Sequence, residues 1–263
     1  MPENSVALAD LALIREAALE GARIAMGYFQ KDPEVWYKNG TSPVTEADIA
    51  VDRFLRDSLC SARSDYGWLS EETEDDRSRL DRQSVFVVDP IDGTRAFVHG
   101  EDMWCVSIAV VRSGEVQCGV LACPARGEVF EASIGAASVK DGAPLRIDST
   151  RDQMVLSMPK TLFKHLPEGF VDRITRSGHI PSLAYRIAMV ADGRLDGTLV
   201  KPNSHDWDLA AADLILRNAG GALLDRKGSQ ICYNKSDVSH GLLIAGSGDL
   251  LSELGNVARS IDL

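Results

Sequence analysis

The sequence predicts a protein with an α+β first half and an α/β second half. Three observations support this: helical periodicity near the N-terminus, hairpin-rich apolar runs in the middle, and alternating strand and helix patterns from about residue 150. We therefore divide the chain into halves of residues 1–150 and 151–263. No linker-like composition separates them, so we expect the halves to pack tightly.

The first predicted elements are two helices. Apolar residues recur at helical spacing over residues 5–30, and breaker dipeptides predict a loop from Lys31 to Pro43. A second helix should begin after Thr45, a suitable N-cap that is followed by acidic residues in the first turn. This helix should turn five apolar residues inward: Ala47, Val51, Phe54, Leu55 and Leu59.

Strands dominate the middle of the chain. Val85–Val88 is a continuous apolar run that ends at Asp89-Pro90, and Ser-Gly and Arg-Gly turns join three further runs. These runs are Trp104–Val111, Val116–Ala122 and Glu128–Ala132. In the second half we expect strands over 154–158, 196–200, 221–225 and 241–245, and helices over 182–192, 208–219 and 248–260.

The charge of the chain limits its partners. Its 263 residues carry 39 acidic and 28 basic side chains, a formal charge of −11, which disfavours direct nucleic-acid binding and anionic membranes. A phosphate substrate would therefore need cations at its site. Five cysteines without a C-x-x-C pair, no signal-peptide pattern and no apolar run of about 18 residues predict a cytoplasmic protein with free thiols.

The most informative segment joins the run at Val85–Val88 to a predicted turn. Asp89 and Asp92 leave a buried strand three residues apart, and Pro90 stiffens the bend. The turn can aim the Ile91 carbonyl in the same direction, so that three hard oxygens converge, as Mg²⁺ prefers. The alternative is that Asp92-Gly93 is simply a turn signal.

Three other acidic positions are candidates, each with an ordinary alternative. Glu71 and Glu72 precede the same strand, but a solvated charge run explains Glu72 better than a site does. Asp208 falls in the first turn of a predicted helix, where an N-cap role is common. Asp48 follows Thr45 closely enough to be an ordinary first-turn acid.

Together these residues resemble the inositol monophosphatase superfamily of metal-dependent, lithium-sensitive phosphatases. The resemblance covers nearly the whole chain and rests on four segments in matching order. They are Pro43 to Asp48, Glu71-Glu72, Asp89-Pro90-Ile91-Asp92-Gly93-Thr94, and Trp207-Asp208 followed by small residues and Gly220-Gly221. It implies a layered αβαβα sandwich, usually a homodimer, that hydrolyses a small-molecule phosphate monoester with two or three Mg²⁺ ions.

The resemblance also implies roles for single residues. By similarity, Glu71, Asp89 and the Ile91 carbonyl hold one Mg²⁺, while Asp89, Asp92 and Asp208 hold a second. Some members bind a third ion near Glu71, and Lys38 is expected close to that position. Thr94, hydrogen-bonded to Asp48, positions the attacking water. The amides of Gly93 and Thr94 bind phosphate oxygens, so that the substrate is bordered by these residues together with Asp92 and Asp208.

The phosphate ester is less clearly indicated. Inositol monophosphatases carry an acid shortly before the Trp-Asp pair, but here residues 199–204 contain no acid and Lys201 is a cation. With Ser182 and Arg186 on the helix predicted from residue 182, Lys201 favours a substrate with a second anionic group. The alternative for Lys201 and Arg186 is plain surface solvation. We favour adenosine 3',5'-bisphosphate, since Tyr66 to Thr73 also resembles bacterial 3'(2'),5'-bisphosphate nucleotidases.

Four other functions stay open. The chain could act as an inositol-1-phosphate phosphatase or as a histidinol-phosphatase, although a cationic amine would fit Lys201 and Arg186 poorly. A fructose-1,6-bisphosphatase is possible on the shared fold, although the chain is short for one. The fourth alternative is a mainly protein-binding regulatory role.

Overall fold

The computed structural model describes residues 2–38, 42–148 and 153–261, so the predicted division near residue 150 lies outside the described residues.

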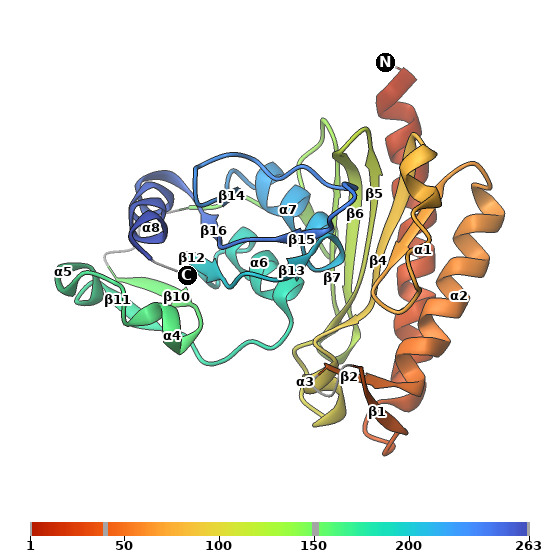
Figure 1. The fold of residues 1–263 in the computed structure, drawn as a ribbon, viewed down its shortest axis with the longest axis horizontal. Helices are drawn as coiled ribbons and strands as arrows, with labels where there is room; N and C mark the ends of the chain where they lie inside the picture. Colours follow the sequence, from red (N-terminus) through yellow and green to blue (C-terminus); the bar gives the residue numbers. More distant parts are fainter. Residues whose placement is uncertain (1, 39–41, 149–152, 262–263) are drawn as a thin grey trace.

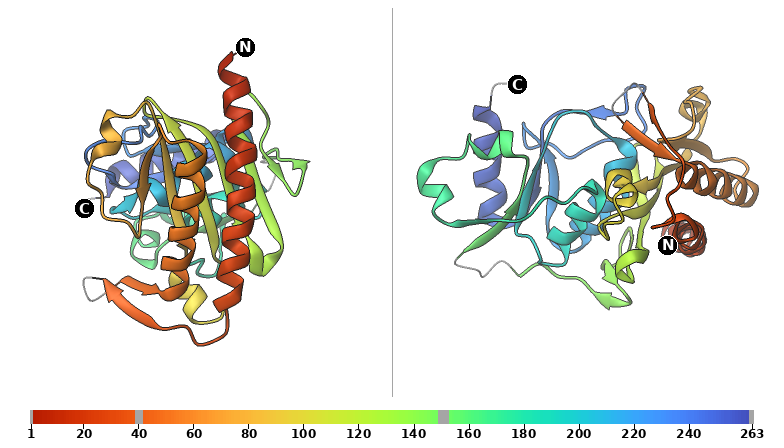
Figure 2. Two further views of the ribbon diagram at one scale, coloured as in Figure 1. Left: turned by 90° about the vertical axis from the view of Figure 1, so that its right-hand side faces the viewer. Right: turned by 90° about the horizontal axis from the view of Figure 1, so that it is seen from below.

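Figure 1 shows five layers. Helices α1 (Pro2–Tyr28) and α2 (Glu46–Ala62) cover one face of a seven-stranded sheet, and Figure 2 shows them side by side. Helices α6 (Leu183–Ala191) and α7 (Asp206–Asn218) separate this sheet from a five-stranded one. Three helices form the last layer: α4 (Lys160–Phe163), α5 (Glu168–Val171) and α8 (Gly248–Ser260). The αβαβα sandwich is confirmed.

The larger sheet has the order β3-β4-β5-β6-β7-β8-β9. Strands β3 and β4 are parallel, and each later pair is antiparallel, as expected for successive hairpins. The strands are β3 (Gly67–Ser70), β4 (Ser84–Asp92), β5 (Cys105–Arg112), β6 (Glu115–Cys123), β7 (Glu128–Ser133), β8 (Val139–Lys140) and β9 (Ala143–Pro144). Short helical turns flank it at η1 (Ser78–Asp81), α3 (Thr94–Val98) and η2 (Pro124–Arg126).

The smaller sheet has the order β11-β10-β12-β16-β14. Strand β10 runs parallel to β11 and β12, while β16 is antiparallel to β12 and β14. The strands are β10 (Met154–Ser157), β11 (Ile174–Arg176), β12 (Gly197–Val200), β14 (Ala222–Asp225) and β16 (Leu243–Gly246). A separate two-stranded ladder joins β13 (Ser204–His205) to β15 (Ser239–His240).

A continuous apolar core holds the two central helices between the sheets. Val85 and Val111 of the larger sheet, Leu209 and Ile215 of α7, and Leu223 of the smaller sheet belong to one buried cluster. A second cluster packs α1 and α2 on the opposite face of the larger sheet. Although α1 is long, no helix among the described residues is both long and apolar enough to cross a bilayer.

Two predicted local structures are wrong. The expected loop from Lys31 to Pro43 contains a hairpin, in which β1 (Val35–Lys38) pairs antiparallel with β2 (Ser42–Thr45). The expected turn at Asp89 is strand, because β4 continues to Asp92 with a shift of register between the two aspartates. Such an irregularity accommodates Pro90, which has no N–H for the ladder.

The contact between β6 and α7 generates a stability prediction. A Cβ built at Gly119 would lie 2.7 Å from the Ala211 Cα, whereas one at Gly27 meets nothing within 4 Å. Because backbone must move, Gly119→Ala should lower the free energy of unfolding by about 1–3 kcal/mol. Gly27→Ala, the control in a helix, should raise it by roughly 0.5–1 kcal/mol. Urea unfolding measures both, and equal effects would contradict this account of the packing.

Candidate metal centre

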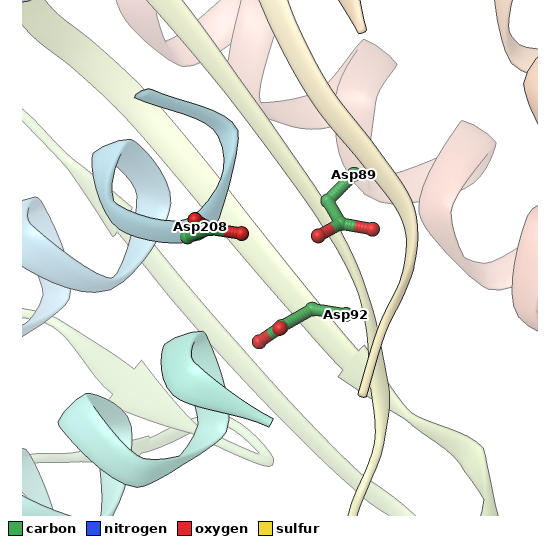
Figure 3. Close-up of side chains that lie close together, drawn as sticks. All are labelled: Asp89, Asp92 and Asp208. Carbon is green, nitrogen blue, oxygen red and sulfur yellow. The ribbon is translucent and has the colours of Figure 1, made fainter. Parts of the chain in front are cut away.

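Three aspartates from two halves of the chain converge at one point. Asp89 and Asp92 stand at the end of β4, and Asp208 stands in the first turn of α7 (Figure 3). One carboxylate oxygen from each residue lies within 4.8 Å of the other two. Asp89 and Asp92 are buried, and Asp208 is partly buried. The structure therefore brings together three of the predicted metal ligands.

Backbone amides hold these carboxylates in place. Asp89 Oδ1 accepts a hydrogen bond from the Ile91 amide at 3.0 Å, and Asp208 Oδ2 accepts one from the His205 amide at 2.7 Å. The second bond is half of a capping box, so the same carboxylate fixes the start of α7. Asp89 and Asp208 each keep one oxygen without a protein donor among the described residues.

Asp92 is held by the N-terminus of α6. Its Oδ2 accepts from the Ser182 hydroxyl and from the Ala184 amide, both at 2.6 Å, and its Oδ1 accepts from the Leu183 amide at 3.2 Å. Free amides and the dipole at a helix start favour a carboxylate there.

This arrangement corrects the prediction that Ser182 contacts the substrate. The Ser182 side chain is fully buried. Its hydroxyl donates to Asp92 and accepts from the Tyr185 amide at 3.1 Å, as the N-cap of α6. Ser182 is a support for Asp92, and the sequence did not reveal it because the two residues are 90 positions apart.

Glu71 and Glu72 behave differently from each other. Glu71 lines the same cavity of about 350 Å³ as the three aspartates. The Glu72 side chain is only 1% exposed and forms an ion pair with Lys38, so its interpretation as part of a solvated charge run is wrong. Lys38 also donates to the Glu71 carbonyl at 3.1 Å. The β1–β2 hairpin therefore delivers one cation beside the acidic site.

Direct ion pairs among the described residues do not offset the charge of the acids in this cavity, although Arg95 also lines it. Within the described part of the chain, no Lys or Arg forms an ion pair with Glu71, Asp89, Asp92 or Asp208. Burial, and then neighbouring carboxylates, raise the pKa of Glu71 to about 8 and the pKa of Asp208 to about 7. The pKa of Asp89 is raised well above its usual range by the same causes. So much buried negative charge is tolerable only with protons or with a cation.

Asp48 and Thr94 meet beside this cluster. The Thr94 hydroxyl lies 3.3 Å from Asp48 Oδ1 and 3.0 Å from the Ile91 carbonyl, and it can donate to either oxygen. Thr45 fixes the other carboxylate oxygen of Asp48 through its amide at 2.8 Å and its hydroxyl at 2.6 Å. Burial raises the pKa of Asp48. Ile91 itself is fully buried, between two cavity residues, Asp89 and Asp92.

The floor of the cavity continues into α3. Gly93 precedes this helix with φ 96°, a left-handed conformation that suits glycine, and Gly93 and Thr94 both line the cavity. The first amides of a helix have no acceptor within it. Both predicted phosphate contacts therefore lie beside the three aspartates.

A second cavity of about 600 Å³ adjoins the first. Asp92, His179, Pro181 and Asp208 line both cavities. The second cavity has a cationic lining made of Lys160, Arg176, Arg186 and Lys201. Lys160, Arg176 and His179 were missed by sequence reasoning, because no motif distinguishes them from ordinary surface residues.

Arg186 is the buried member of this cationic lining. It is 9% exposed, and its Nε has no hydrogen-bond partner. Burial lowers the pKa of Arg186 to about 10, against the opposing effect of Asp92. Plain surface solvation therefore does not describe Arg186, whereas Lys201 is exposed at the rim. A buried guanidinium with an unsatisfied donor is suited to an anionic ligand.

Comparisons with known proteins agree with this geometry. The model of the inositol monophosphatase family matches residues 8–260. A histidinol-phosphatase from Chlorobaculum parvum is 30% identical over 261 residues, covering 95% of this chain and 98% of that protein. An inositol-1-monophosphatase from Rhizobium meliloti is 33% identical over 208 residues, covering 74% and 76%. The crystal structure of the extragenic suppressor protein suhB from Bartonella henselae superposes with a TM-score of 0.84 at 26% identity, covering 96% and 99%. The chain therefore belongs to the inositol monophosphatase family and is a phosphoric monoester hydrolase.

Proposed function

We propose that this protein hydrolyses, with Mg²⁺, a phosphate monoester whose leaving group carries a second anionic group. The leading substrate is adenosine 3',5'-bisphosphate. One observation carries the proposal: a carboxylate cluster that no described Lys or Arg pairs with opens directly into a cavity lined by Lys160, Arg176, Arg186 and Lys201. The carboxylate cluster suits a divalent cation, and the cavity lined by basic residues suits an anion.

The residues present fit Mg²⁺. The donors are all oxygens, which this hard cation prefers, and their raised pKa values reflect charge that a cation would neutralise. Glu71, Asp89, the Ile91 carbonyl, Asp92 and Asp208 would hold the metal. The Lys38 ammonium beside Glu71 favours two ions over three, since like charges repel. When bound, Mg²⁺ supplies positive charge for the phosphoryl group and lowers the pKa of water.

The protein's own groups orient the reactants. Thr94 and Asp48 form a hydroxyl–carboxylate pair at the edge of the cluster, and Thr45 holds Asp48 from behind. This pair is placed to accept a proton from a water molecule and to fix its direction of attack. The amides of Gly93 and Thr94 are positioned to bind phosphate oxygens.

The cationic cavity supports the choice of leaving group. Arg186 Nε would donate a hydrogen bond to a second anionic group of the substrate, whereas inositol offers only hydroxyls and histidinol offers an amine. The full-length similarity to a histidinol-phosphatase keeps histidinol phosphate as the competing candidate. A panel of adenosine 3',5'-bisphosphate, inositol 1-phosphate, histidinol phosphate and fructose 1,6-bisphosphate discriminates these activities. A protein-binding role would instead persist in a variant that cannot bind metal.

We predict that stabilisation by Mg²⁺ increases from about pH 6 to about pH 8. In metal-free protein, Asp208 and Glu71 have pKa values raised to about 7 and about 8. The stability that such raised acids contribute is lost as the pH rises through those values. Over the same range protons compete less with Mg²⁺. The difference in Tm between Mg²⁺ and EDTA, measured at both pH values, should therefore grow.

Asp89→Asn provides the control for this experiment. An Asn oxygen can still accept from the Ile91 amide, while the buried negative charge is removed. We expect a higher Tm in EDTA, loss of the shift with Mg²⁺, and a kcat lower by at least about a thousandfold. A variant that still gains stability from Mg²⁺ and turns over normally would exclude Asp89 as a ligand.

Substitution of Thr94 tests the proposed orientation of water. Thr94→Val should lower kcat by about a hundredfold with little change in KM, because the hydroxyl acts on water and not on the substrate. Thr94→Ser keeps the hydroxyl and should retain most of the activity. Steady-state kinetics on both variants decides the matter, and equal losses in both would point to packing alone.

Arg186→Met tests the second anionic group. Loss of one charged hydrogen bond should raise KM for adenosine 3',5'-bisphosphate by about ten- to a hundredfold. Adenosine 3'-monophosphate, which lacks that anion, should be affected much less. Arg186→Lys, which keeps the charge, should fall between wild type and Arg186→Met. If both substrates respond alike, Arg186 does not recognise the second anion.

A further inference from the structure

A buried aspartate beside the metal centre has no part in the chemistry described so far. Asp206 is the first residue of α7, two positions before Asp208, and it is only 1% exposed. It lines neither cavity of the site. Its Oδ1 accepts from His240 Nε2 at 2.7 Å, and its Oδ2 accepts from the Asn234 amide at 2.7 Å. Both carboxylate oxygens are therefore bonded within the protein, and Asp206 holds the polypeptide in place.

The loop that carries Asn234 joins Asp206 to a second buried charge. Asn234 Oδ1 accepts from Arg79 Nη1 at 2.6 Å, and the Lys235 carbonyl accepts from Arg79 Nη2 at 3.0 Å. Arg79 is fully buried in η1, and it also donates to the two carboxylate oxygens of Asp75 at 3.1 Å and 2.8 Å. We call Arg79, Asn234 and Asp206 the polar bridge, because they connect η1 to the first turn of α7.

The polar bridge ends on two segments that carry proposed metal ligands. Arg79 lies in the connection from β3 to β4, which begins at Glu71, and Asp206 shares a helical turn with Asp208. Glu71 and Asp208 line the same cavity, although they come from opposite halves of the chain. Their like charges push the two segments apart, so bonds elsewhere must fix the spacing between them.

We propose that the polar bridge is a positioning device, which sets the spacing between Glu71 and Asp208 before a cation binds. The inference rests on the proposed function, since it takes both carboxylates as ligands of Mg²⁺. This ion demands near-ideal octahedral geometry, so displacement of a ligand by about half an ångström weakens its binding. Carboxylates that are already placed need no rearrangement when the ion arrives, which favours binding.

The backbone at Asn234 allows the polar bridge to be cut with little disturbance. Asn234 has φ 56°, a left-handed conformation that glycine adopts most easily and that Asn and Asp tolerate better than other residues. Asn234→Gly therefore keeps the backbone and the amide that donates to Asp206, while it removes the acceptor for Arg79. Asn234→Asp keeps an acceptor in the same place. The position thus offers a matched pair of variants.

The neighbouring residue provides a control for general loosening of the loop. The Tyr233 hydroxyl donates to Asp213 Oδ2 at 2.9 Å, and both side chains are buried. Asp213 lies about two turns further along α7 than Asp206, so Tyr233→Phe weakens the same loop at a point away from the polar bridge. If the polar bridge only stabilised the fold, Tyr233→Phe and Asn234→Gly would act alike on metal binding.

Calorimetric titration of metal-free protein with MgCl₂ at pH 8 tests the proposal, with Tm in EDTA as the measure of folding. The Kd for Mg²⁺ should rise about tenfold in Asn234→Gly, and it should stay within about twofold of wild type in Asn234→Asp and in Tyr233→Phe. Tyr233→Phe should nevertheless lower Tm, because a buried hydrogen bond is lost. Arg79→Lys keeps the charge but cannot reach all three acceptors, so it should also raise the Kd, and it replaces Asn234→Gly if that variant does not fold.

The outcomes separate this inference from the proposed function. An unchanged Kd in Asn234→Gly, an equal rise in Tyr233→Phe, or no recovery in Asn234→Asp overturns the positioning role. Binding of Mg²⁺ by wild type then leaves the proposed function standing. If wild type binds no Mg²⁺, the proposed function fails, and the positioning role is overturned with it.

Discussion

The mutual repulsion of buried carboxylates is the constraint on which this molecule depends. One carboxylate oxygen each of Asp89, Asp92 and Asp208 lies within 4.8 Å of the other two without a Lys or Arg partner among the described residues, and Glu71 lines the same cavity. Left to themselves, such charges would separate or move into water. They cannot, because each aspartate is bonded to backbone amides of packed elements. The five-layer core thus holds together negative charge that a divalent cation would neutralise.

Helix α6 connects the two ends of the site. Its first turn holds Asp92 through Ser182 and two amides, and Arg186 lies one turn further along the same helix. The distance from the carboxylate cluster to the buried guanidinium is therefore set by helix geometry and not by a flexible loop. A substrate that spanned both cavities would therefore meet a fixed separation between the acidic cluster and the Arg186 guanidinium.

Much of this could be predicted from the sequence, for identifiable reasons. Helical periodicity revealed α1 and α2, and the Asp89–Thr94 segment is too unusual to be a simple turn. Contacts between distant segments could not be predicted. Glu72 looks solvated until the hairpin that carries Lys38 is folded against it, and Ser182 looks free until β4 brings Asp92 to it. In both cases local composition carries no sign of the partner.

The opposite charges of the two cavities imply that binding and turnover depend on different conditions. The carboxylate cluster repels phosphate unless a bound cation offsets its negative charge. Protons would compete with that cation near neutral pH, because the pKa values of Glu71 and Asp208 are raised to about 8 and about 7. The cavity that Arg186 lines is positively charged without a metal, because Arg186 stays charged across this pH range even with a pKa lowered to about 10. Acidification would therefore displace a metal from the proposed site, while the lining of the second cavity would keep its positive charge. Under the proposed function, a nucleotide product would retain the second anion but not the hydrolysed phosphate, and its release would then depend on Arg186 more than on the acidic cluster.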